Sequence, residues 1–250
     1  MPPTERYERY AAIYDRTGQD DFSLWAWQTA RVALDGLGWR GWHVLELACG
    51  TGAAAEQMAR EGLQVVAVDL SRPMLLEARQ RARHAEFRVV RADMRQLSLA
   101  TGSFDLVTSF YDSFNYLLDP SELAQTLREV ARVLRPGGYL VFDLNTPFTL
   151  REHWTGLCHA QLTDELGSIW LSEWLEAEQV SSLRASFFVR GDDGRYDRFD
   201  EVHDERGFTE REIETAAKAA KLKLAHIEDL RTGRKPHKDS RRNLYVCRRT

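Results

Sequence analysis

The stretch HVLELACGTGAAAEQMAREG, residues 43–62, connects an apolar run to a run with helical periodicity through a loop that carries Gly50 and Gly52. Glycine lacks a Cβ and adopts backbone conformations that other residues avoid, so a ligand can approach such a loop closely. The loop also matches the dinucleotide pattern G-x-G-x-x-[GA], which by itself is a weak signal. It therefore predicts either a nicotinamide dinucleotide or a smaller adenosine cofactor.

The first half of the chain repeats this alternation of apolar strand and amphipathic helix. We expect strands at 43–48, 63–70, 87–93, 103–110 and 139–145, and helices at 52–62, 71–84 and 120–138. Continuous apolar strands separated by helices predict a parallel sheet that is covered on both faces. After a helix at 209–222, strands at 222–230 and 243–249 should return to this sheet.

Residues 150–207 follow a different pattern. In LRASFFV, the side chains of Leu183, Ala185, Phe187 and Val189 fall on one face of a strand, and a turn follows at GDDG. Such alternation is typical of antiparallel strands with one covered face. We therefore expect one domain over 1–250, with an N-terminal helical segment over 1–40 and a small antiparallel insertion over 150–207.

Composition argues against several classes of protein. The 250 residues carry a formal net charge of −4, with 43% hydrophobic and 29% charged residues, which is ordinary for a globular enzyme and unlike a dedicated nucleic-acid binder. No apolar run reaches the about 20 residues that span a bilayer, and the N-terminus lacks the apolar core of a signal peptide. The three cysteines show neither disulfide nor zinc spacing, so we expect a reduced, cytoplasmic protein without a metal.

Three acidic residues at expected strand ends distinguish between the two cofactors. Glu46 precedes the glycine loop, where a carboxylate would repel a pyrophosphate and suit a cationic ligand. Asp69 can accept hydrogen bonds from ribose hydroxyls. Asp93, followed by Met94, is placed to accept from an adenine amino group. A cationic end, a ribose and an adenine together describe S-adenosylmethionine. The alternative for each acid is structural, such as helix capping by Asp69.

The segments ELACGTG, VDLS, RADM, SFDLVTS and LRPGGYLVFDLN, in this order and spacing, resemble the class I S-adenosylmethionine-dependent methyltransferases, in particular their small-molecule, sugar N-methyltransferase-like members. The resemblance implies an α/β, Rossmann-like, doubly wound sheet of seven strands whose last strand is antiparallel. It also implies that 1–40 forms a lid and that the insertion roofs the active site. The cofactor-binding residues implied are Tyr14, Glu46, Ala48, Gly50, Gly52, Asp69, Leu70, Met74, Asp93, Met94 and Ser109.

Candidate catalytic residues come from three segments. Tyr14 belongs to a Tyr-Asp pair that small-molecule methyltransferases often carry near the N-terminus. Tyr111 and Asn115 follow the fourth strand, beyond the carboxyl end of the sheet, where ligands bind. Glu201 and His203 share one strand face, and a neighbouring carboxylate makes an imidazole a better general base. The structural alternatives are packing of Tyr14 on the sheet from a surface helix, capping of the following turn by Tyr111 and Asn115, and an exposed polar strand face for the Glu201–His203 pair.

Methyl transfer from a sulfonium mainly requires an aligned acceptor lone pair and exclusion of water, and a base is needed only if the acceptor arrives protonated. The sequence therefore predicts an enzyme that methylates a small molecule at N or O by direct displacement, with a homodimer as one option and no membrane partner. RNA methylation, supported by the basic stretch 231–242, is an alternative, but the NPPY or DPPY motif is missing. A non-catalytic cofactor-binding protein and a nicotinamide oxidoreductase are the others.

Overall fold

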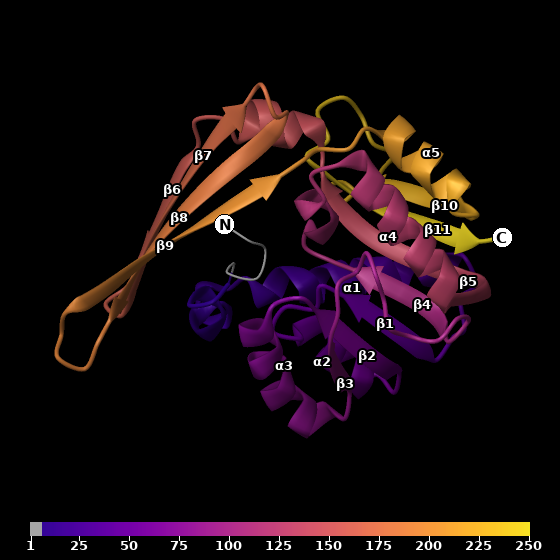
Figure 1. Cartoon of the computed structure of the whole chain (residues 1–250), viewed down its shortest axis with the longest axis horizontal. Helices are drawn as coiled ribbons and strands as arrows, with labels where there is room; N and C mark the ends of the chain where they lie inside the picture. The colour runs from indigo at the N-terminus through magenta and orange to yellow at the C-terminus, as the bar shows by residue number, and fades with distance from the viewer. Residues whose placement is uncertain (1–6) are drawn as a thin grey trace.

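The computed structural model describes residues 7–250, which form a seven-stranded sheet covered by helices and a separate four-stranded sheet (Figure 1). The large sheet has the order β10-β11-β5-β4-β1-β2-β3. Its strands are β1 His43–Leu47, β2 Gln64–Asp69, β3 Arg88–Arg91, β4 Phe104–Ser109, β5 Leu134–Asn145, β10 Leu222–Asp229 and β11 Arg242–Arg249. Strands β1 to β5 pair in parallel, and β11 is antiparallel to both of its neighbours, which confirms the predicted fold class.

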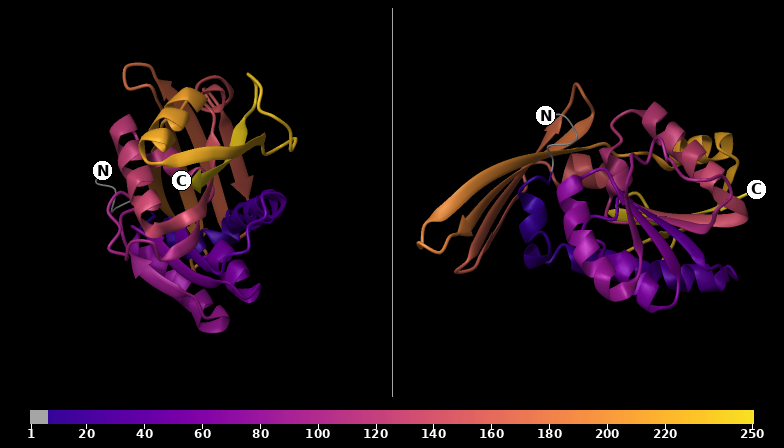
Figure 2. Two further views of the ribbon diagram at one scale, coloured as in Figure 1. Left: turned by 90° about the vertical axis from the view of Figure 1, so that its right-hand side faces the viewer. Right: turned by 60° about the horizontal axis from the view of Figure 1, so that its bottom comes forward.

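Helices cover both faces of the large sheet (Figure 2). One face carries α1 Asp20–Gly36, α2 Ala53–Arg60 and α3 Arg72–Ala85, and the other carries α4 Pro120–Val133 and α5 Glu210–Ala219. Each face has its own apolar cluster, with Trp27 and Met58 buried on the first and Leu127 and Ile213 on the second. This two-sided burial explains why the parallel strands read as continuous apolar runs. No helix among residues 7–250 is both long and apolar enough to cross a membrane.

The junction between α4 and β5 differs from the prediction of a helix over 120–138. The helix ends at Val133 and the strand already begins at Leu134, so the predicted boundary was wrong. Pro136 has no N–H to donate and disfavours helical backbone at the residue before it. Leu134 instead pairs with Phe104 of β4, which extends the sheet by the residues that the sequence assigned to the helix.

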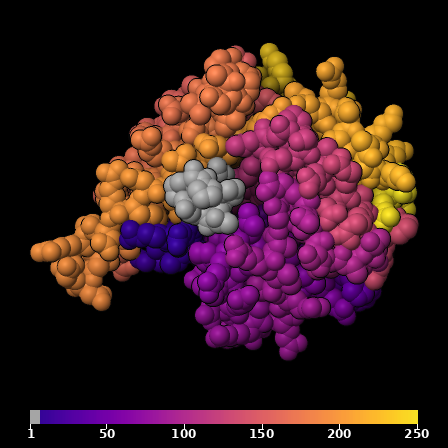
Figure 3. Space-filling view, viewed as in Figure 1, coloured from indigo at the N-terminus to yellow at the C-terminus, as the bar shows by residue number. Residues whose placement is uncertain are grey.

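The second sheet has the order β6-β7-β8-β9, and all of its pairings are antiparallel, as the alternation over 150–207 indicates. Its strands are β6 Cys158–Leu162, β7 Leu166–Leu175, β8 Val180–Arg190 and β9 Tyr196–Glu205. A short π-helix, η5 Thr149–His153, leads into it from β5. The end that carries the β8–β9 turn projects beyond the rest of the molecule (Figure 3). Its inner face buries Phe187 against Tyr10 of the N-terminal segment.

The N-terminal segment lies between the four-stranded sheet and α3 and contains two short 3₁₀ helices, η2 Tyr10–Ile13 and η3 Asp15–Thr17. Arg81 of α3 donates hydrogen bonds to Asp15 at 2.7 Å, to Asp20 at 2.9 Å and to Glu56 at 2.9 Å. Asp15 also accepts a 2.7 Å bond from Thr51 in the glycine loop. Arg81 therefore connects the N-terminal segment to α1, α2 and α3. Residues 1–6 of the predicted lid lie outside the described residues.

Replacing Arg81 with methionine should leave three neighbouring carboxylates without their shared cation. Hydrogen bonds to charged groups contribute about 1.5–3 kcal/mol, and the Arg81 side chain is 25% exposed, so solvent screens part of this. We expect the free energy of unfolding to fall by about 1–3 kcal/mol in urea denaturation. Arg60→Met, which removes an exposed partner of Glu56, should cost less than about 0.5 kcal/mol. Equal losses in the two variants would contradict the bridging role.

Candidate active site

A cavity of about 590 Å³ opens at the carboxyl ends of β1, β2 and β4, where ligands bind in open α/β sheets. Most of the predicted cofactor-binding residues line it. They are Tyr14, Glu46, Ala48, Gly50, Asp69, Leu70, Met74, Asp93 and Met94. The parallel strands thus bring together three separate segments of the sequence, and Tyr14 of the N-terminal segment joins them.

The glycine loop shapes one wall of this cavity. Ala48, Gly50 and Gly52 have positive φ values of 50°, 54° and 83°. A Cβ on Gly50 would meet no atom within 4 Å, so this position leaves the backbone accessible to a ligand. A Cβ on Gly52 would lie 3.1 Å from both Ala78 and Phe87. The absence of a Cβ at Gly52 therefore allows the loop to pack closely against α3, whereas its absence at Gly50 leaves the backbone open to the cavity.

Glu46 places a buried negative group at the same wall. The residue is 2% exposed, and its Oε2 atom has no hydrogen-bond partner among residues 7–250. Burial raises the pKa of Glu46 to about 8, a hydrogen bond from the Ala55 backbone opposes this, and nearby Asp69 adds to it. A buried carboxylate with a free oxygen is costly to keep ionised, so it fits a ligand that presents a cation.

Asp69 and Asp93 both line the cavity, but their pKa values are shifted in opposite directions. The Asp69 carboxylate accepts hydrogen bonds from the N–H groups of Ser71 at 2.8 Å and Gly50 at 2.9 Å, and burial raises its pKa. These bonds orient it and leave lone pairs for ribose hydroxyls. Burial also acts to raise the pKa of Asp93, but hydrogen bonds from Arg95 outweigh this and lower it. An adenine amino group would share the Asp93 carboxylate with Arg95.

The residues present fit S-adenosylmethionine. Glu46 would hold its cationic end, Asp69 its ribose, and Leu70, Met74 and Met94 its adenine, beside the open backbone at Gly50. When bound, this cofactor supplies a methyl group that its sulfonium already activates for transfer. The protein then has to bind, orient and shield the acceptor.

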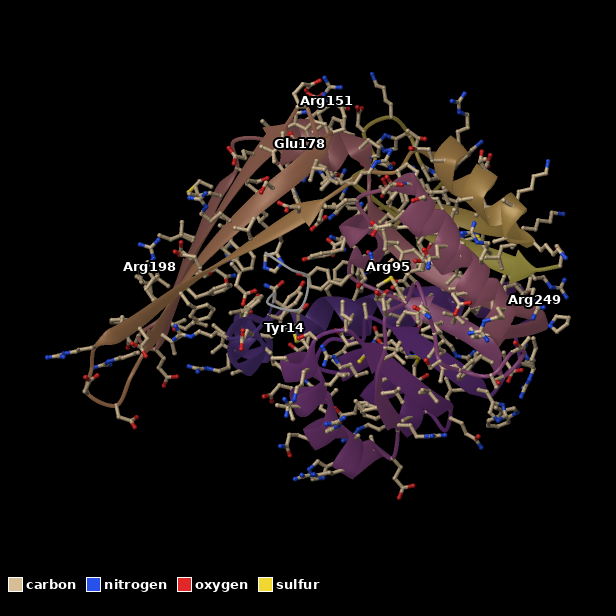
Figure 4. All side chains as sticks on the ribbon, in the orientation of Figure 1. Tyr14, Arg95, Arg151, Glu178, Arg198 and Arg249 are labelled. Atoms are coloured by element: carbon tan, nitrogen blue, oxygen red, sulfur yellow. The ribbon has the colours of Figure 1, made fainter. Side chains whose placement is uncertain are left out.

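A second cavity of about 280 Å³ adjoins the first and lies partly beneath the four-stranded sheet. The two cavities share four tyrosines, which are Tyr7, Tyr14, Tyr111 and Tyr116. Figure 4 shows Tyr14 between the four-stranded sheet and the larger sheet. The remaining wall includes Trp154, His159, Trp170, His203, Glu205, Asp112 and Arg242. Because the two cavities share these tyrosines, a molecule in the second cavity would lie beside a molecule in the first.

A buried ion cluster forms one side of the second cavity. Arg242 donates hydrogen bonds to Asp112 at 2.6 Å and to Asp143 at 2.9 Å. Tyr111 and Asp112 have positive φ values of 60° and 51°, and their successive N–H groups converge on the Asp143 carboxylate at 2.7 and 3.1 Å. This anion-binding arrangement compensates for an unfavourable backbone. Burial raises the pKa of Asp143 to about 6, although Arg242 opposes the shift.

Glu201 and His203 both point inward from β9 and lie side by side, and each also contacts other groups. The Glu201 carboxylate accepts hydrogen bonds from the backbone N–H groups of Tyr7 at 3.0 Å and Tyr10 at 3.3 Å, so it anchors the N-terminal segment. His203 lines the second cavity. Its Nδ1 lies 3.0 Å from the Tyr116 hydroxyl, and its Nε2 lies 3.4 Å from Glu201. Both ring nitrogens therefore face protein groups.

Besides Glu201, three other predicted site residues line neither cavity. Gly52 packs against α3, and Ser109 is buried at the end of β4 with no hydrogen-bond partner for its hydroxyl among the described residues. The fully buried amide of Asn115 donates to the backbone oxygens of Asn145 and Arg206 and accepts from the Asn145 N–H. Asn115 thus holds three chain segments together. Cofactor contact by Gly52 and Ser109, and catalysis by Asn115, stay predictions.

Glu205 and Arg242 line the second cavity but were not predicted as site residues. Glu205 stands two positions beyond His203 on the same face of β9, so the strand alternation that identified Glu201 and His203 also applied to it. Arg242 stands at the end of the basic stretch 231–242. Nothing in the sequence near Arg242 indicates that its guanidinium pairs with residues about a hundred or more positions earlier.

Comparison with known proteins agrees with the class that this fold and cavity define. Residues 44–138 match the family model described as a methyltransferase domain. An S-adenosylmethionine-dependent methyltransferase from Clostridium acetobutylicum ATCC 824 is 30% identical, with a TM-score of 0.85 over 97% of this chain and 98% of that one. The Bacillus subtilis (strain 168) protein named "Putative methyltransferase YqeM" is 30% identical over 98% of this chain and 97% of its own length. The chain belongs to the S-adenosylmethionine-dependent methyltransferases.

A further solved structure resembles the chain over both sheets. The sugar N-methyltransferase KedS8 from Streptoalloteichus sp ATCC 53650 is 27% identical, with a TM-score of 0.77. The alignment covers 97% of this chain and 93% of KedS8. The four-stranded sheet is therefore part of the architecture that the two proteins share.

The raised pKa of Glu46 predicts a pH dependence of cofactor binding. A cationic ligand binds the ionised carboxylate, so binding below about pH 8 releases the proton that Glu46 carries. We expect the affinity for S-adenosylhomocysteine, which retains the ammonium group, to rise from about pH 6 to about pH 8, by up to about tenfold per pH unit. Calorimetric titrations measure this slope. Glu46→Gln should bind more weakly and lose the slope; parallel pH profiles would contradict the assignment.

Proposed function

We propose that this protein transfers a methyl group from S-adenosylmethionine to an amine nitrogen of a small molecule that binds in the second cavity. The observation that carries the proposal is an excess of acid beside aromatic rings. Asp112 and Glu205 line the cavity and Asp143 lies directly behind them, against the single cation Arg242. Carboxylates together with tyrosine and tryptophan rings form a favourable environment for a cationic amine.

The dimensions of the second cavity favour a small acceptor over RNA. A volume of about 280 Å³ is close to the lower end of ordinary small-molecule sites, which begin near 300 Å³. The basic stretch 231–242, which suggested RNA, contributes only Arg242 to the cavity walls, and that guanidinium is paired with Asp112 and Asp143. The sugar N-methyltransferase KedS8 also supports a small acceptor and a nitrogen nucleophile.

The shared tyrosines would orient the acceptor and keep water from the reacting atoms. Burial raises the pKa of Tyr14 and of Tyr111, so both hydroxyls stay protonated and act as hydrogen-bond donors. The Tyr111 hydroxyl donates to Gln19, which precedes α1. In this proposal the N-terminal segment is the lid of the active site and the four-stranded sheet is its roof. Alignment and exclusion of water are what a direct displacement needs from the protein.

The proposal predicts methyl transfer that depends on an amino group. Purified protein with methyl-labelled S-adenosylmethionine should label members of a panel of small primary and secondary amines, such as glucosamine. Their hydroxyl counterparts, such as glucose, should remain unlabelled. An Asp69→Ala control should lose labelling with every acceptor, because the ribose contact is removed. Label found only in hydroxyl acceptors, or only in RNA added as a separate arm, would contradict the proposal.

A further inference from the structure

We infer that Glu205 accepts the proton of the acceptor nitrogen before methyl transfer, an inference that rests on the proposed amine site in the second cavity. Glu205 is the last residue of β9, where it pairs with Ser181 of β8. This register directs it to the same face as Glu201 and His203, toward the large sheet. Glu205 thus joins the roof of the cavity to the ion cluster on its other side.

The contacts of Glu205 leave one carboxylate oxygen for a ligand. The residue is 4% exposed and lines the second cavity. Its Oε2 atom accepts a 3.0 Å hydrogen bond from the Asn145 side-chain amide. No hydrogen bond from residues 7–250 reaches its Oε1 atom, and no arginine, lysine or histidine among them forms an ion pair with it. One oxygen is therefore fixed in position and the other is available.

The charges around Glu205 make its carboxylate a stronger base than an exposed glutamate. Burial and the negative charge of Asp112 raise the pKa of Glu205, and Asp143 acts in the same direction. The Asn145 hydrogen bond and the Arg242 charge oppose them but do not cancel the shift. Besides Asp112 and Arg242, the other titratable groups that line the cavity are His159, His203, Tyr7, Tyr10, Tyr14, Tyr111 and Tyr116. A general base works best when its pKa lies near the operating pH, which an ordinary glutamate does not reach.

The other polar groups of the cavity are less suited to this role. Asp112 accepts 2.6 Å hydrogen bonds from both Arg242 and Asn145 on one oxygen. Asp143 is completely buried, and both of its oxygens accept hydrogen bonds. His203 has Tyr116 on one ring nitrogen and Glu201 near the other. Glu205 is therefore the carboxylate in this cavity wall without an arginine partner.

The reaction consists of a proton transfer followed by a displacement. One N–H bond of the acceptor ammonium breaks, and the proton bonds to Oε1 of Glu205. The lone pair left on nitrogen forms a bond to the methyl carbon while the carbon–sulfur bond breaks and its electron pair stays on sulfur, giving S-adenosylhomocysteine. The methylated nitrogen carries the positive charge that the sulfonium lost. Glu205 returns its proton to solvent when the product leaves.

Proton release on amine binding tests the inference without turnover. In solution the ammonium probe carries a proton, and burial favours the protonated form of the Glu205 carboxyl, whereas the complex retains one proton between the two groups. Benzylamine binding to the protein saturated with S-adenosylhomocysteine should therefore release up to about one proton near pH 7. Calorimetry in two buffers of different ionisation enthalpy measures this number. Glu205→Gln should release much less, and Glu205→Asp should restore part of the release.

Matched controls separate Glu205 from general effects on the fold. Glu173→Gln changes an exposed carboxylate of the same small sheet and should behave as the wild type. Affinity for S-adenosylhomocysteine should stay unchanged in every variant, because Glu205 does not line the first cavity. Equal proton release in wild type and Glu205→Gln would overturn the role of Glu205 while the amine site stands. Failure of benzylamine to bind the wild type, while benzyl alcohol binds, would overturn the amine site and the inference together.

Kinetics with an amine acceptor should give a second, independent readout. Removing a general base lowers the rate by about 10²–10⁴-fold, so Glu205→Gln should lower kcat by this factor with a smaller change in KM. The wild-type kcat should rise with pH as Glu205 ionises, and this limb of the profile should disappear in Glu205→Gln. A variant that raises KM alone and keeps the wild-type pH profile would show that Glu205 only binds the acceptor.

Discussion

The pairing of Arg242 with Asp112 and Asp143 is the interaction on which the geometry of the active site depends. It joins the loop after β4 to β5 and to the first residue of β11, which are distant in sequence. Asn145 extends the connection to the second sheet. Its side-chain amide donates to Asp112 and also to Glu205, which belongs to β9. Removing one member of a buried ion pair leaves an uncompensated charge, which costs about 3–5 kcal/mol. The strained backbone at Tyr111 and the position of the roof both depend on this cluster.

The N-terminal segment contributes residues to the walls of both cavities. Tyr10 stacks on Phe187 of the small sheet at 4.3 Å, and Glu201 holds the backbone of Tyr7 and Tyr10. A few residues later, Asp15 bonds to Thr51 in the glycine loop. The same short segment therefore contacts the four-stranded sheet beside the second cavity and the glycine loop beside the first cavity. Any opening of this segment that admits one ligand would also alter the walls around the other.

The cofactor side of the site could be predicted from the sequence because its signals are local. Glu46 and Asp69 lie at the carboxyl ends of β1 and β2, Asp93 follows the end of β3 by two residues, and parallel strands end at one edge of the sheet. The acceptor side depends on contacts between distant segments, which periodicity does not reveal. Arg242 resembles the solvated basic residues around it, and Glu201 binds backbone N–H groups that carry no sequence signature. The α4–β5 boundary was wrong because strand pairing at Leu134 prevailed over helical periodicity.

Glu46 and Glu205 play parallel parts in the two cavities. Each is a buried carboxylate with one oxygen that receives no hydrogen bond from residues 7–250, and burial raises the pKa of both. Such groups weaken the ligand-free fold at a pH where they must ionise, and a cation that binds beside them offsets the loss. Two cations on either side of the tyrosine wall would also repel each other. Transfer of the acceptor proton to Glu205 would therefore create the nucleophilic lone pair and remove that repulsion in a single step.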